Sequence, residues 1–109
     1  MGNREERIAR NEVTAREINE QIERGHAGAP AWEQVRVLCE CGWLDCDRVV
    51  AITIAEYEAV RADPRQFAVV RDHVMPEVEV VLTEADRYTV VVKREGTPAA
   101  IAVQEDPRS

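Results

Sequence analysis

The sequence has few aromatic residues and no long apolar run. Aromatic residues make up only 5% of the 109 residues, so we expect a core built mainly from valine, isoleucine, leucine and alanine. No apolar stretch approaches the roughly 18 residues of a membrane-spanning helix, so we expect no membrane segment. The first residues, MGNREERIARNE, are charged where a secretory signal is apolar. We therefore expect a cytoplasmic protein.

Lysine is also scarce, and acidic residues outnumber basic ones. The chain has 21 acidic and 14 basic side chains, for a formal net charge of -7, and all but one of the basic residues are arginine. The basic residues are dispersed, whereas proteins that bind phosphate backbones usually concentrate them in a patch. Nucleic acid is therefore a poor candidate partner, and a protein with a basic surface is a better one.

Motifs of the common enzyme classes are missing as well. The sequence has no phosphate-binding glycine loop, no HExxH motif and no pattern typical of a Ser-His-Asp triad. We therefore expect a protein that is not an enzyme.

Hydrophobic residues make up 45% of the chain, which is ordinary for a folded protein, and 109 residues suffice for one domain. We expect that domain to span residues 1–109. It would contain an N-terminal helix over 4–24, an α+β core over 32–103 and a frayed tail over 104–109.

The segment 4–24 has the periodicity of an amphipathic helix. Its apolar residues form one narrow stripe: Ile8, Val13, Ala15, Ile18 and Ile22. Such a stripe favours packing against the helix's own domain. Ile8, Ile18 and Ile22 are also candidate interface residues, should the helix bind a partner instead.

The rest of the chain alternates between strand and turn patterns. Strands are predicted over 32–39, 48–54 and 66–70, with a hairpin formed by 77–83 and 87–95 and an edge strand over 99–103. The first hairpin arm also fits a helix, because it begins with Pro-Glu. Thr53 and Glu56 have the spacing of a capping box, which predicts a short helix after the second strand. The predicted fold is α+β, with the N-terminal helix packed on a small antiparallel sheet.

All three cysteines of the chain lie in VLCECGWLDCD, residues 37–47. Cys39 and Cys41 are two residues apart at the end of a predicted strand, so their side chains would project on one face. Gly42 follows, and we expect it to adopt a left-handed conformation that turns backbone N–H groups toward the thiolates. Cys46 is close enough to fold back to the same centre. The pattern C-x-C-G-x3-C therefore predicts a zinc-knuckle-like loop that binds Zn2+.

A fourth zinc ligand must come from elsewhere in the chain. The candidates are His26, His73, Asp45, Asp47 and a water molecule. We favour His73, because a loop anchored between two strands loses less entropy on closing the site than the glycine-containing linker around His26.

Two other interpretations of the cysteines remain open. Cys41 and Cys46 are far enough apart to form a disulfide, as a redox site would require. Alternatively, all three thiols are buried and inert. The polar neighbours Glu40, Gly42, Asp45 and Asp47 argue against an apolar environment.

Aromatic side chains offer a further signal for an interface. Trp43 and Leu44 lie at the tip of the cysteine loop and are candidate interface residues. We expect Trp32 and Tyr57 to belong to the core.

Several stretches resemble a group of short, largely uncharacterised actinobacterial proteins. They are RNEVTAREINEQIE (10–23), CECGWLDC (39–46), TIAEYEAVRADPRQF (53–67), HVMPEVE (73–79) and YTVVVK (88–93). The resemblance implies a three-cysteine, one-histidine site formed by Cys39, Cys41, Cys46 and His73. It implies no particular activity.

The sequence thus favours a small zinc-binding module that interacts with a protein partner or regulates it. A thiol redox sensor that releases zinc on oxidation is the alternative. A zinc protein that binds nucleic acid fits the acidic composition less well.

Overall fold

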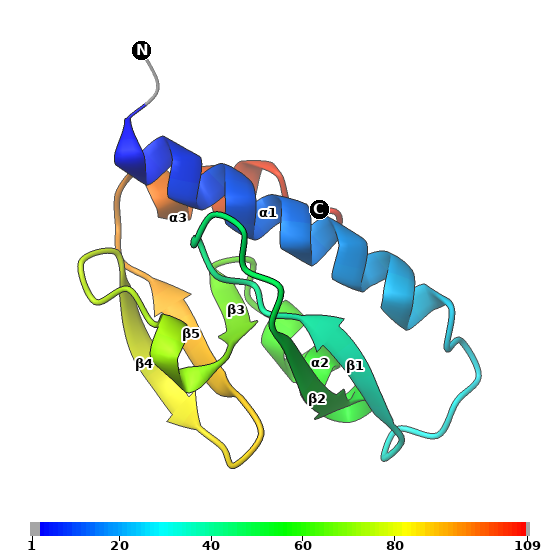
Figure 1. The fold of residues 1–109 in the computed structure, drawn as a ribbon. Coiled ribbons are helices and arrows are strands. Elements are labelled where there is room, and N and C mark those ends of the chain that lie inside the picture. The colour runs from blue at the N-terminus through cyan, green and yellow to red at the C-terminus, as the bar shows by residue number, and fades with distance from the viewer. Residues whose placement is uncertain (1–2, 109) are drawn as a thin grey trace.

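The structure is a computed structural model that describes residues 3–108, and it has an α+β fold (Figure 1). The N-terminal helix lies across two small antiparallel sheets, with strand orders β1-β2 and β3-β5-β4. The predicted fold class is therefore confirmed, with two sheets where we expected one. The elements, in chain order, are α1 (Arg4–Arg24), β1 (Gln34–Leu38), β2 (Val49–Thr53), α2 (Ile54–Arg61), β3 (Gln66–Val69), the 3-10 helix η1 (Arg71–His73), β4 (Glu79–Glu84), β5 (Thr89–Lys93) and α3 (Thr97–Gln104).

Local side-chain caps set the starts of α1 and α2. The side chain of Asn3 accepts a hydrogen bond from the Glu6 N–H and caps α1. The capping box predicted from Thr53 and Glu56 is present and starts α2 directly after β2. Within the described residues, no helix combines the length and apolar character needed to cross a membrane.

The face that α1 buries differs from the predicted apolar stripe. The helix does pack on its own chain, against α3 and β1. Its buried residues, however, are mostly polar: Ile8, Ala9, Glu12, Arg16, Asn19 and Glu20. Ile18 is 42% exposed, and Ile22 is half-buried. The helix is rotated because its inward polar side chains find ionic and hydrogen-bonding partners in the sheets, which the apolar periodicity does not reveal.

Two larger apolar clusters form most of the core, and a third, smaller one contains Ile8, Met75 and Val78. The largest one joins the first sheet to α2 and part of the second sheet, and contains Val35, Val37, Val50, Ile52, Tyr57, Val60, Ala68, Tyr88 and Val90. The second lies next to the cysteine loop and contains Cys39, Cys41, Phe67, Val69, Val91 and Ala102. Tyr57 is buried as expected, whereas Trp32 is 76% exposed in the turn before β1, so its assignment to the core was wrong.

The C-terminal half confirms the hairpin and corrects the last element. β4 and β5 pair in antiparallel register, so the alternative helix for the first arm is wrong. The predicted edge strand over 99–103 is instead part of α3. Gly96, at φ 140°, turns the chain, and Pro98 stands in the first helical turn, where it costs no hydrogen bond. Alanines then favour the helical conformation.

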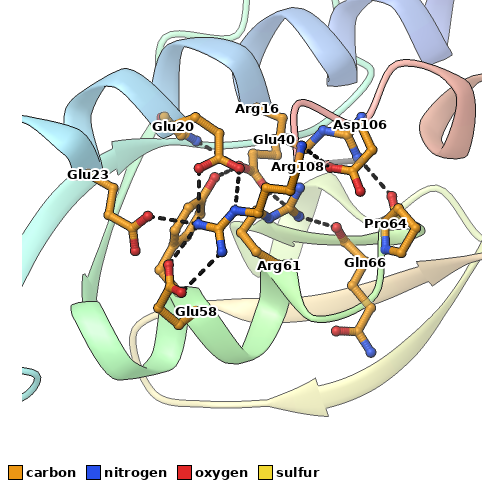
Figure 2. Close-up of polar contacts among 12 residues, drawn as sticks. Arg16, Glu20, Glu23, Glu40, Glu58, Arg61, Pro64, Gln66, Asp106 and Arg108 are labelled. Atoms are coloured by element: carbon orange, nitrogen blue, oxygen red, sulfur yellow. Dashed lines mark hydrogen bonds and ion pairs between the residues drawn. The ribbon is translucent and has the colours of Figure 1, made fainter.

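The tail after α3 contacts both other α-helices through Arg108. The Arg108 guanidinium donates hydrogen bonds to Glu20 and Glu23 of α1 and to Glu58 of α2 (Figure 2). Charge-assisted bonds to three carboxylates favour an ordered tail, and the fraying of residues 104–109 stays a prediction. Ser109 lies outside the described residues.

Candidate metal centre

The structure brings Cys39, Cys41, Cys46 and His73 together from three segments of the chain. Cys39 directly follows β1, Cys46 shortly precedes β2, and His73 belongs to η1 after β3. The three sulfurs and one ring nitrogen all lie within 4.8 Å of one another. Among the described residues, this is the group of cysteine, histidine and acidic side chains whose positions suit a metal ion.

The histidine approaches the three sulfurs almost equally. Its Nδ1 atom lies 3.7 Å from the sulfur of Cys39, 3.4 Å from that of Cys41 and 3.3 Å from that of Cys46. In a tetrahedral site with the usual zinc–sulfur and zinc–nitrogen bonds, a sulfur and a nitrogen ligand are roughly 3.6 Å apart. The three nitrogen–sulfur distances therefore suit a tetrahedral coordination shell. All three cysteines are free thiols.

Backbone N–H groups stabilise negative charge on the sulfurs. The Val70 N–H donates to the Cys39 sulfur at 3.2 Å. A hydrogen bond from the Cys39 thiol, together with the backbone N–H of Trp43, lowers the pKa of Cys41 to about 5. The same thiol–thiolate hydrogen bond raises the pKa of Cys39, and burial raises that of Cys46. Without metal, these hydrogen bonds favour a negative charge shared within the cluster.

Gly42 has a different role from the one predicted. Its φ is not positive, and the left-handed residue of the loop is Asp45, at φ 63°. Gly42 is needed for close packing instead. A side-chain carbon added there would lie 2.9 Å from Cβ of Ile8 and 3.1 Å from its Cα. The loop and α1 therefore touch at a point where only glycine fits.

Two asparagines of α1 hold the loop on either side of its first two cysteines. Asn19 donates to the carbonyl oxygen of Leu38 and accepts from the Leu38 N–H, so it satisfies the backbone just before Cys39. Asn11 donates to the Gly42 carbonyl oxygen at 3.1 Å, just after Cys41. These bonds anchor the sulfurs to a long helix, which reduces the entropy lost on metal binding.

Glu40, between the two cysteines, is a supporting residue that sequence reasoning missed. Its polarity argues against an apolar environment for the cysteines, and that argument is wrong, because Glu40 is fully buried and Cys39 and Cys41 belong to an apolar cluster. Its carboxylate accepts hydrogen bonds from Asn19, Tyr57 and the Ala68 N–H, and Arg61 lies 3.5 Å away. Side chains alternate between the two faces of an extended chain, so a residue between two ligands points away from the metal site. This alternation was the sequence signal for Glu40.

A second buried ionic group lies beneath α1. The Lys93 amine contacts the carboxylates of Glu12 and Glu79, and all three side chains are buried. Burial raises the pKa of Glu12 to about 8, although the charge of Lys93 opposes the rise. Lys93 also lies 5.5 Å from the centre of the Phe67 ring. This group explains why Glu12 faces inward from α1.

The other candidate ligands lie outside the cluster. His26 is exposed at the end of α1, with Nδ1 2.9 Å from the Ile22 carbonyl oxygen. Asp45 and Asp47 are exposed in the loop and do not belong to the metal-binding group.

The candidate interface residues fall into two places. Trp43 stacks on the His73 ring, with centroids 5.1 Å apart and planes inclined by 14°. It remains 50% exposed, and Leu44 beside it is 78% exposed. Ile8 is buried next to this loop, whereas Ile18 and Ile22 lie further along α1.

The chain matches no protein-family model, no curated protein and no solved structure. What it can do is therefore inferred from the site. Three thiols and an imidazole form a group positioned to bind a metal ion in a small α+β protein.

Proposed function

We propose that the protein is a small cytoplasmic zinc-binding module that acts by interaction or regulation and not by catalysis. The observation that supports zinc best is the nearly equal approach of His73 Nδ1 to the three sulfurs. Thiolate and imidazole are ligands that zinc accepts readily in tetrahedral geometry. Three cysteines and one histidine would fill that geometry and leave no position for a reactive water, which favours a structural ion. Kinship with the actinobacterial group that the sequence resembles is part of this proposal.

The test compares zinc content and melting temperature in the wild type, His73→Ala and His26→Ala. We expect about one zinc per chain in the wild type and in His26→Ala. His73→Ala should bind less zinc and melt at a lower temperature, because a metal bound only by the folded state adds its binding free energy to folding. Equal zinc and equal melting in wild type and His73→Ala would contradict the proposal. So would a cooperatively folded protein that carries no metal when purified without chelator.

A thiol redox sensor is the second candidate, and the access to the sulfurs supports it. Cys46 is partly exposed, and a hollow of about 190 Å3 beside α1 is lined by all three cysteines. With a peroxide as oxidant, one thiolate would attack a peroxide oxygen to give a sulfenic acid and hydroxide. A second thiol would then displace water to form a disulfide, here between Cys41 and Cys46, and zinc would be released.

Peroxide at thiol-stoichiometric concentration should release zinc to a chromophoric chelator, and dithiothreitol should restore binding if this second function holds. Full retention of zinc under those conditions would leave the structural role alone.

A further inference from the structure

An apolar groove lies between the first turns of α1 and the tip of the cysteine loop. Its volume is about 470 Å3, within the usual range of binding sites. Ile8 and Met75 line it as buried residues, and Trp43 and Leu44 line it as exposed ones. Trp43 and Leu44 are 50% and 78% exposed and adjacent in the chain, and unlike the other exposed apolar side chains, such as those of Trp32 and Leu82, they line a groove with a buried apolar floor.

The charges around this groove are opposite in sign to those of the whole molecule. Arg4, Arg7 and Arg10 of α1 line it, with Glu6 as the one acidic lining residue. Arg4 also pairs with the exposed Glu77. The three arginines are three residues apart, so their positive charge extends along the groove. The whole chain, in contrast, has a net charge of -7.

We infer that this groove binds an acidic peptide segment of a partner protein, with one or two large apolar side chains as anchors. The anchors would pack on Leu44, Trp43 and the apolar floor, and acidic residues flanking them would face the arginines. An apolar centre with a charged rim is the usual anatomy of a protein interface.

Nucleic acid fits this groove less well. Its floor is apolar, Glu6 is part of its lining, and the remaining surface would repel a polymer with a negative charge at every phosphate. A short peptide with few carboxylates meets less of that repulsion and offers the apolar side chains that the floor requires.

The inference rests on the proposed metal site, because one wall of the groove is the cysteine loop. Trp43 stacks on His73, and Asn11 holds the Gly42 carbonyl oxygen. A metal held by the cysteines and His73 would keep that wall in place and so preorganise the groove for binding.

The experiment is a selection of random dodecapeptides, displayed on phage, against the zinc-loaded protein. An enriched peptide is then titrated by fluorescence anisotropy against wild type and two groove variants, Leu44→Ser and Arg10→Glu. Trp32→Ser is the control for Leu44→Ser, because it removes an exposed apolar side chain outside the groove. Arg36→Glu is the control for Arg10→Glu, because it makes the same charge change at an exposed position of β1. Zinc content is measured for every variant.

Enriched peptides should place aspartate or glutamate around leucine, phenylalanine or tryptophan. Each groove variant should weaken binding by about tenfold or more, as loss of an anchor contact does, while the controls change it by less than about twofold. Absence of enrichment, a basic consensus, or equal effects of groove and control variants would overturn the inference. So would tighter binding of a single-stranded DNA oligonucleotide to the same groove, or self-association that Leu44→Ser abolishes.

Zinc content separates the two proposals. A wild type that carries zinc but enriches no peptide would refute the groove alone. A wild type that binds peptide without zinc would instead refute the metal proposal.

Discussion

Gly42 is the residue at which the cysteine loop and α1 come closest. An added methyl group would lie under 3 Å from the Ile8 side chain and near its backbone, so the loop would have to move away from the helix. We expect Gly42→Ala to lower the free energy of unfolding by about 1–3 kcal/mol, the usual cost of overpacking. It should also weaken metal binding, because Cys41 precedes it. Urea denaturation and zinc titration measure the two effects.

Gly25→Ala is the control for that substitution. Gly25 has a helical backbone, and an added carbon would meet only the Ile22 and Gln21 carbonyl oxygens, at 3.3 and 3.7 Å. Equal effects of the two alanine substitutions would show that contact with Ile8 is not what requires glycine at 42.

Glu12 should make the stability depend on pH. Burial raises its pKa from 4.5 to about 8, so between these values the folded state holds a proton that the unfolded state has released. The contribution of Glu12 to stability is therefore present below about pH 4.5 and is lost as the pH rises to about 8. We expect Glu12→Gln to remove this decline, so that its unfolding free energy depends less steeply on pH between these values.

The measurement is urea denaturation of both proteins across this pH range, saturated with zinc. Metal binding itself strengthens with pH, so the informative quantity is the difference between the two curves. Glu17→Gln, an exposed change on the same helix, serves as the control. Parallel curves for the wild type and Glu12→Gln would contradict the assignment.

At the scale of elements, one arginine ties the tail after α3 to both other helices. Arg108 bonds to Glu20, Glu23 and Glu58, and the hydrogen bond from Arg108 holds the pKa of Glu58 near 2 (Figure 2). Arg108→Ala should lower stability by about 1–2 kcal/mol at neutral pH, because exposed pairs contribute little while Glu20 would lose a partner in a buried position.

The loss should shrink as the pH falls from about 4.5 toward 2. A carboxylate with a depressed pKa contributes its stability above its ordinary pKa and loses it on protonation. Thermal melting at several pH values, with exposed Arg71→Ala as the control, measures this. A pH-independent loss would assign the role of Arg108 to packing of its side chain.

Elements with one buried face could be predicted from sequence, because alternation reports that face directly. Val35 and Val37 of β1 show this alternation. The Thr53 capping box is a second local signal, and it predicted where α2 begins. The inward face of α1 could not be predicted in the same way. Glu12 is buried because Lys93, 81 residues away, lies opposite it, and no local pattern records such a distant partner.

At the scale of the whole molecule, the same distinction applies to the metal centre. The cysteine spacing and the anchored loop of His73 indicated a shared site, since both are local features that strand ends bring together. Glu40 could not be recognised as buried, because its partners come from α1, α2 and β3. The basic rim of the groove could not be predicted from the sequence either, because only the fold places the arginines of α1 beside Trp43 and Leu44.

The burial of Lys93 has a consequence for the chemistry of the whole surface. It is the single lysine among these 109 residues, and it is 2% exposed. Acetyl, methyl and ubiquitin groups that enzymes attach to lysine side chains thus find no acceptor among residues 3–108 while the fold is closed. A reagent that acylates amines can reach Lys93 only when α1 moves away from the sheets. The rate at which Lys93 is acylated therefore measures how often the molecule opens.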